Sequence, residues 1–147
     1  MKATTVLATA LLLAACSAHA QSGSDCPALP ATSGLAWEKL DGKDYTFCKA
    51  IRASDGAQVL AVMITGDAPF RPRRGNRTVE TVIDGKDTWW YRSELSGQSG
   101  IEVRETLVEL DSSNVAHISL RGDETQLSEA MSLARELRFD VVRLSTN

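Results

Sequence analysis

The chain has 147 residues and a formal net charge of −3, from 16 basic and 19 acidic side chains. This length suits one domain with a packed core and is short for two. The mildly acidic balance lacks the basic surplus of nucleic-acid-binding proteins, so we expect no nucleic-acid partner.

The first element in chain order is a secretion signal over residues 1–15. Lys2 gives a positive start, and an apolar run of about ten residues follows, half of the roughly twenty that a membrane helix requires. Residues 13–16 (Leu-Ala-Ala-Cys) resemble a bacterial lipobox, in which Cys16 is acylated. Cleavage after Ala20 is the alternative. We favour the lipobox because Cys16 ends the apolar run, and we expect a periplasmic protein anchored to the membrane as a lipoprotein.

Residues 16–34 are rich in Ser, Ala, Gly and Pro without an apolar period, which predicts a tether before a single domain at 35–147. Cys26 and Cys48 remain after processing, and an even pair outside the cytoplasm predicts a disulfide. It would close a loop of about 23 residues and stabilise the fold by roughly 3 kcal/mol. Two unpaired buried thiols are the alternative. Redox catalysis is not expected, because the spacing is not Cys-x-x-Cys.

Strand signals begin at residue 35. Asp-Gly turns at 41–42 and 55–56 separate alternating segments, and residues 58–64 are apolar on both faces. This apolar segment predicts a central strand that is covered on both sides. A buried helix is the alternative, but the length between the two glycine turns is that of a strand.

Residues 78–83 and 87–95 predict a hairpin around an Asp-Gly turn. Trp89 and Trp90 are adjacent in its second strand, so they point to opposite faces. We therefore expect one of the two indoles in the core and the other at least partly exposed.

The following strand changes its apolar phase. Ile101 and Val103 occupy one phase, whereas Val108 and Leu110 occupy the other. A side-chain period of two cannot place both pairs on one face, so the pattern predicts a β-bulge or bend near residues 104–106.

Residues 123–138 predict the clearest helix. Asp123 and Gln126 have the spacing of a capping box, and apolar residues follow at helical intervals. The expected fold is α+β: an antiparallel β-sheet of about six to seven strands with one C-terminal amphipathic helix packed on one face.

Little in the sequence points to catalysis. His117 is a lone histidine on a predicted strand, where a surface position is the expected one. No cysteine and histidine spacing indicates zinc, and no nucleophile elbow or phosphate-binding loop is present. Scattered carboxylates such as Glu102 and Glu105 are better explained as a charged outer face than as a glycosidase pair. We therefore predict no enzyme, no catalytic residue, no cofactor and no metal.

Two stretches suit recognition. The first is a proline-braced basic loop with four arginines within seven residues: Arg71, Arg73, Arg74 and Arg77. Such a loop suits an acidic partner surface or anionic head groups, and a merely solvated loop is the alternative.

The second stretch is a small polar tip between two strands, made of Ser96, Gly97, Gln98, Ser99 and Gly100. Most such tips only connect strands. Loops of this composition also fit clefts, because they bring hydrogen bonds with little bulk.

Taken together, these features resemble the periplasmic immunity proteins of bacteria with type VI secretion. The resemblance rests on residues 13–16, the pair Cys26 and Cys48, the small size and the lack of catalytic groups. Residues 101–139 also resemble a PsbP-like sheet-and-helix domain. The resemblance implies that the partner is a secreted, peptidoglycan-degrading effector toxin, expected to be a muramidase, whose active-site cleft the protein blocks.

In this interpretation the tip at 96–100 enters the cleft and the arginine loop acts at its rim. Two other functions stay open: a structural or assembly lipoprotein of the envelope, and a small-molecule or lipid carrier. A wide apolar cavity between sheet and helix would favour the carrier.

Overall fold

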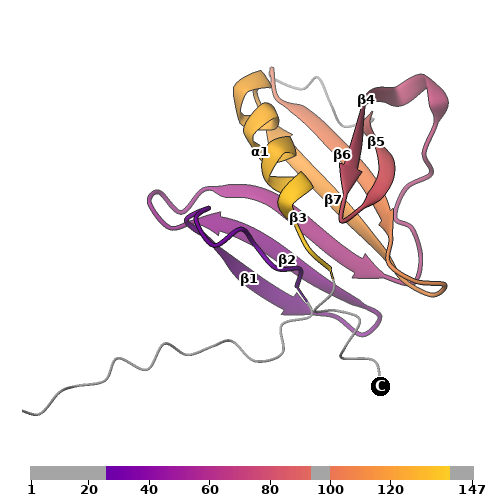
Figure 1. Cartoon of the computed structure of the whole chain (residues 1–147), viewed down its shortest axis with the longest axis horizontal. Coiled ribbons are helices and arrows are strands. Elements are labelled where there is room, and N and C mark those ends of the chain that lie inside the picture. Colours follow the sequence, from indigo (N-terminus) through magenta and orange to yellow (C-terminus); the bar gives the residue numbers. More distant parts are fainter. Residues whose placement is uncertain (1–25, 94–99, 140–147) are drawn as a thin grey trace, which may run out of the picture.

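The computed structural model describes residues 26–93 and 100–139 of the chain (Figure 1). Within these residues it has seven strands, a short 3-10 turn (Arg74–Asn76) and one α-helix. The elements in chain order are β1 (Leu35–Asp41), β2 (Tyr45–Arg52), β3 (Gln58–Thr65), β4 (Arg77–Ile83), β5 (Lys86–Arg92), β6 (Glu102–Glu109), β7 (Val115–Gly122) and α1 (Glu124–Glu136). The predicted α+β class is confirmed.

The seven strands form one open antiparallel sheet in the order β1-β2-β3-β7-β6-β5-β4. β3 therefore lies beside β7, and β4 lies at the far edge. The chain between β3 and β4 must cross from the middle of the sheet to that edge. Leu60, Ala61 and Val62 of β3 are all buried, as predicted for a central strand covered on both faces.

One expectation about the sheet is wrong. β6 pairs with β7 in unbroken register from Glu102 to Glu109, so there is no bulge near residues 104–106. The register shifts fall in β2 and β4 instead. β6 accommodates both apolar phases because it is an inner strand with cover on both faces: Val108 is buried on one face, and Val103 is half-buried on the other.

The helix α1 packs on one face of the sheet and contacts β7, β4, β3 and β6 (Figure 1). The predicted capping box is present: the Gln126 backbone N–H donates to the Asp123 carboxylate at 2.9 Å, and the Asp123 N–H donates to the Gln126 side chain at 3.0 Å. The apolar stripe of α1 meets the inward residues of β7. The buried contacts between them comprise Leu127, Ala130, Ala134, Ala116, Ile118 and Leu120.

The predicted hairpin of β4 and β5 is also confirmed. Its two turn residues, Asp84 and Gly85, have φ values of 50° and 73°. Positive φ at both central residues is what a tight two-residue hairpin turn requires. Trp90 is 1% exposed and joins the core, whereas Trp89 is only half-buried on the other face.

The segment before β1 is fixed to the domain at three points. The predicted disulfide joins Cys26 to Cys48 of β2, and both side chains are buried. Ala28 forms a β-bridge with Arg138, just beyond α1. The indole N–H of Trp37 donates to the backbone carbonyl of the residue after Cys26 at 2.7 Å. This segment therefore ties β2 to the end of the helix.

The hairpin of β4 and β5 is joined to the rest of the sheet by few main-chain contacts. Among the described residues, β5 pairs with β6 in register at Tyr91 and Arg92, at the end of β5, and the Ser93 N–H donates to the Val103 carbonyl just beyond. Nearer the turn, the side chain of Thr88 spans the two strands. Its hydroxyl lies 2.9 Å from the hydroxyl of Thr106 and donates to the carbonyl of Leu107 at 3.0 Å.

Candidate functional site

The candidate site lies on the face of the sheet opposite α1. The connection from β3 to β4 (residues 66–76, the crossover loop) covers part of this face, because Phe70 contacts His117 of β7. Ala116 and Ile118 on either side of His117 belong to the core under α1. Neighbouring side chains of a strand point to opposite faces, so His117 and Phe70 lie on the open face.

Two aromatic contacts fix the root of the crossover loop. The ring centroid of Phe70 lies 5.3 Å from that of His117 and 5.7 Å from that of Tyr91, which is 7% exposed. The Tyr91 contact is edge-to-face, a favoured geometry that stabilises by about 0.5 to 1.5 kcal/mol beyond its burial. The arginines that follow Phe70 therefore start from a fixed position.

Beside Phe70, His117 and Glu105 form a hydrogen-bonded pair that the sequence did not predict. The Nε2 atom of His117 is 3.1 Å from Oε2 of Glu105, and each side chain is 15% exposed. Burial lowers the pKa of the imidazole below its ordinary value, and the hydrogen bond to Glu105 opposes this effect only in part. At neutral pH His117 is therefore neutral, and its Nε2–H donates to the carboxylate, which only accepts.

Beside this pair is a hollow of about 560 Å³, which we call the arginine hollow. It collects side chains from the crossover loop, β5 and β6. Its walls comprise Ala68, Pro69, Phe70, Arg71, Arg73, Asn76, Tyr91, Arg92, Ser93 and Glu105. Among the described residues, three arginines and one glutamate thus line the hollow, and the Glu105 carboxylate already accepts a hydrogen bond from His117. This excess of basic residues favours anions near the hollow.

The structure brings two of the four predicted arginines into the hollow and leaves two outside it. Arg71 and Arg73 line the hollow, whereas the exposed Arg74 begins the 3-10 turn. Arg77 lies over the indole of Trp89, 5.1 Å from the ring centroid, in a cation–π contact. Arg92 completes the set of three, and only the three-dimensional fold could reveal it.

The second predicted stretch lies mainly outside the described residues. Ser96, Gly97, Gln98 and Ser99 belong to the segment 94–99, of which the structure describes nothing. Gly100 is described: it is exposed, with a φ of 72° that favours glycine. Ser93, the residue before this segment, lines the arginine hollow. The signal at 1–15 and Cys16 also lie outside the described residues.

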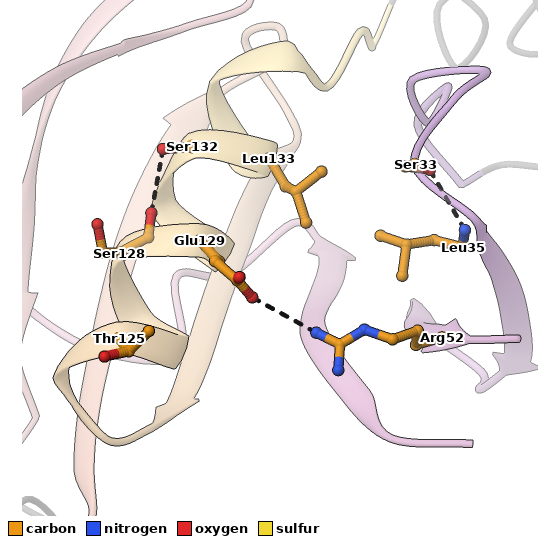
Figure 2. A pocket seen from close by; sticks show the side chains of 8 residues that line it. All are labelled: Ser33, Leu35, Arg52, Thr125, Ser128, Glu129, Ser132 and Leu133. Atoms are coloured by element: carbon orange, nitrogen blue, oxygen red, sulfur yellow. Dashed lines mark hydrogen bonds and ion pairs between the residues drawn. The ribbon is translucent and has the colours of Figure 1, made fainter. Parts of the chain in front are cut away.

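A second hollow lies on the other side of the molecule, between α1 and the start of β1 (Figure 2). It has a volume of about 610 Å³. Arg52 and Glu129 approach each other across it at 3.6 Å, and Leu35 and Leu133 point toward one another (Figure 2). Its remaining walls are hydroxyls from Ser33, Thr125, Ser128 and Ser132.

Within residues 26–93 and 100–139, no cluster of three or more histidine, cysteine or acidic side chains has the arrangement of a metal site. The helix in the same part of the chain is too short and too polar to cross a membrane. No protein family model, no curated protein and no solved structure matches this chain. Any function must therefore be argued from the site itself.

Proposed function

We propose that this protein is a periplasmic immunity protein that binds a secreted peptidoglycan-degrading toxin, in particular a muramidase, and blocks its active-site cleft. The observation that carries the proposal is the cationic crossover loop, held on the open face of the sheet beside the arginine hollow. In this proposal the protein is a binding partner and not an enzyme, and Cys16 anchors it to the membrane.

Charge complementarity favours this kind of target. Most glycoside hydrolases act with two carboxyl groups that flank the scissile bond. The cleft of such an enzyme therefore presents negative charge at its centre. A loop with several fixed arginines is attracted to such a cleft and associates quickly at low ionic strength. The formal charge of the whole chain is −3, so this attraction must come from the local cluster and not from the net charge.

Rigid support also favours inhibition. A segment that must be ordered on binding loses affinity, and a segment that is already fixed avoids this loss. Phe70 fixes the crossover loop through His117 and Tyr91, on a strand and a hairpin whose positions the core determines. The prediction that Gln98 and its neighbours enter the cleft remains part of the proposal, and Ser93, the last described residue before them, lines the arginine hollow.

The test is inhibition of peptidoglycan digestion. The mature protein is added to the secreted proteins of the producing bacterium, and the clearing of a peptidoglycan suspension is followed. The proposal predicts that the mature protein slows the clearing and co-purifies with a peptidoglycan hydrolase. Unchanged clearing at saturating protein, with the protein folded, would contradict the proposed function.

Two double variants then show whether the tip or the arginine loop makes the main contact with the hydrolase. Replacing Gln98 and Ser99 with alanine is compared with replacing Arg73 and Arg74 with alanine. A central residue of an interface typically contributes 2 kcal/mol or more to binding. The tip variant should therefore bind the hydrolase more than about twentyfold more weakly than the wild type. If the tip variant stays within about twofold of the wild type, the tip does not fill the cleft and the arginine loop becomes the main contact.

A further inference from the structure

We infer that the free edge of β4 is a self-association surface, through which two copies of this protein pair their β4 strands in antiparallel orientation about a symmetry axis at Thr81. β4 is the last strand of the sheet, so among the described residues no strand lies on its outer side. The partner in this inference is a second copy of the chain. The inference therefore goes beyond the proposed function and does not rest on it.

The two edge strands of the sheet differ in how they are protected against such pairing. β1 carries four charged or polar-rimmed positions less suited to pairing, and its Lys39 forms an ion pair with Asp41 at 3.2 Å. Charged side chains on an edge strand discourage the addition of another strand. In β4, five of the six residues at 78–83 are β-branched, and none is proline. Val79 and Val82 are 51% and 49% exposed, so β4 is the less protected edge.

The register of the hairpin determines which backbone groups of β4 point to the free side. Ile83 pairs with Lys86 across the two-residue turn, and the register continues without a shift to Glu80. The closing pair of such a hairpin is hydrogen-bonded, and hydrogen-bonded pairs alternate with non-hydrogen-bonded pairs along an antiparallel ladder. Ile83 and Thr81 therefore turn their N–H and C=O groups toward β5. Glu80 and Val82 turn theirs to the free edge.

Charge then selects one register for a symmetric pair. An antiparallel pair with a symmetry axis perpendicular to the sheet places one residue opposite itself. An axis at Glu80 would set two carboxylates face to face, and an axis at Val82 would set Glu80 opposite Asp84 of the other copy, which like charge disfavours. Axes outside this stretch would fall in the register shift of β4 or in the turn. An axis at Thr81 places Glu80 opposite Val82, so no like charges meet.

This register also provides partners for groups that lack them in the single copy. The outward N–H and C=O groups of Glu80 and Val82 hydrogen-bond to those of the other copy. Thr81 is 8% exposed, and its hydroxyl has no hydrogen-bond partner among the described residues. At the axis the two Thr81 side chains form a non-hydrogen-bonded pair, in which opposite side chains are closest and threonine hydroxyls can bond to each other.

The symmetry of the pair determines where the two candidate sites lie. An axis perpendicular to the sheet keeps both open faces on the same side. The crossover loop leads directly into β4 (Figure 1), so each copy carries its loop at one end of the joined strands. A pair therefore presents two crossover loops on one side of a continuous sheet. Because only a short stretch of each strand takes part, the interface is small, and we expect a weak, reversible dimer.

The experiment follows the mature protein at concentrations from about 10 μM to about 1 mM, the range in which a weak interface forms. Sedimentation velocity reports the mass of the species, and amide hydrogen exchange followed by NMR reports the strand contact. We expect a change from monomer to dimer, with the amides of Glu80 and Val82 protected only at high concentration. Thr81 and Ile83 donate within the hairpin, so their amides should be protected throughout. A monomer at every concentration would overturn the inference.

Two variants of Val82 test the register. In this register Val82→Lys places a cation opposite Glu80 of the other copy, whereas Val82→Glu places a like charge there. Each change acts at two symmetric pairs, so the lysine variant should associate at least about tenfold more tightly than the glutamate variant. Protection of the Thr81 and Ile83 amides shows that the hairpin is intact in both variants. Equal association of the two variants would overturn the inference.

Leu40→Glu is the matched control on the other edge strand. Leu40 is 57% exposed on β1, so this change adds the same charge at a comparably exposed position. Its association should stay within a factor of about two of the wild type, as is usual for surface changes outside an interface. Loss of association with Leu40→Glu, and not with Val82→Glu, would move the contact to β1 and overturn the inference.

Two further measurements test other occupants of the β4 edge. A chain that ends at Phe139 lacks residues 140–147, and association that appears only after this truncation would assign the edge to the chain's own C-terminal segment. Protection of the Glu80 and Val82 amides by the captured hydrolase, without self-association, would assign the edge to that partner. Either result would overturn the inference. A dimer that does not inhibit peptidoglycan digestion would leave the inference standing and contradict the proposed function alone.

Discussion

Two regions of the sheet are attached to the centre of the molecule by different contacts. The first is formed by β1, β2 and β3, and the second is the hairpin of β4 and β5. β2 pairs with β1 and β3 along its length, and the disulfide from Cys26 reaches Cys48 in its middle. Within the described residues, β5 pairs with β6 in register only near its end, and nearer the turn it is held by the side chain of Thr88. The candidate site lies at the second region, where side chains set the geometry.

This difference separates stability from recognition. Main-chain ladders and a disulfide hold a region in place whatever its surface residues are. In the hairpin region, Phe70 and Tyr91 contact each other and line the arginine hollow, and Thr88 holds the hairpin to β6. Changes in the first region should therefore alter the stability of the fold with little effect on binding, and changes in the second should alter binding with a smaller effect on stability.

The largest stability effect is expected at the disulfide. Replacing Cys26 and Cys48 with alanine should lower the free energy of unfolding by about 3 kcal/mol, because the unfolded chain regains the freedom of a loop of roughly 23 residues. Chemical denaturation measures this loss, and the wild type in reductant is the control. Below the unfolding transition, inhibition of peptidoglycan digestion should be unchanged. A loss below about 1 kcal/mol would show that the main-chain contacts alone hold this region.

The second effect is expected at Thr88. Thr88→Val removes both of its hydrogen bonds and leaves the buried hydroxyl of Thr106 without its partner, which should cost about 1 to 3 kcal/mol. Hydrogen exchange should speed up in β4 and β5 and stay unchanged in β1 and β2.

Thr81 provides a matched control for this change. It is the cross-strand neighbour of Thr88 and is 8% exposed, but its hydroxyl has no hydrogen-bond partner among the described residues. The same threonine-to-valine change there removes an unsatisfied buried group, so it should be neutral or stabilising by up to about 1 kcal/mol. A comparable loss at both positions would mean that shape, and not hydrogen bonding, holds the hairpin.

The smallest effect is expected from pH. Burial lowers the pKa of His117 below its ordinary value of 6.5. As the pH falls through this value, the unfolded state binds a proton more readily than the folded state, so the free energy of unfolding decreases until the folded imidazole is protonated too. His117→Gln should abolish this part of the pH dependence.

The ring resonances of His117 in an NMR titration report its pKa directly. Glu105→Gln removes the interaction that raises this pKa, so the variant should titrate at a lower pH than the wild type. An unchanged or higher pKa in the variant would exclude the proposed pairing of Glu105 with His117 in solution.

Local signals in the sequence predicted much of the fold. Asp123 and Gln126 marked the start of α1, the Asp-Gly turn marked the hairpin, and the pairing of Cys26 with Cys48 followed from their even number. Each of these features depends on residues close in sequence or on a simple count. The change of apolar phase in β6 led to the wrong prediction of a bulge. The sequence does not tell which inner strands are covered on both faces.

The candidate site was only partly predictable for the same reason. The arginines of the crossover loop stood out because they are consecutive or nearly so. Arg92, Glu105 and His117 come from three strands, and their meeting depends on the sheet order and on the path of the crossover loop. No pattern within one segment encodes such a contact.

The most direct test of the central claim is hydrogen exchange of the mature protein alone and in complex with the captured peptidoglycan hydrolase. The account predicts that protection on binding is concentrated in the crossover loop, the end of β5 and the tip at 96–100, and that β1 and β2 exchange as they do in the free protein. Protection confined to β1, β2 or the groove beside α1, with no change at the crossover loop, would contradict it.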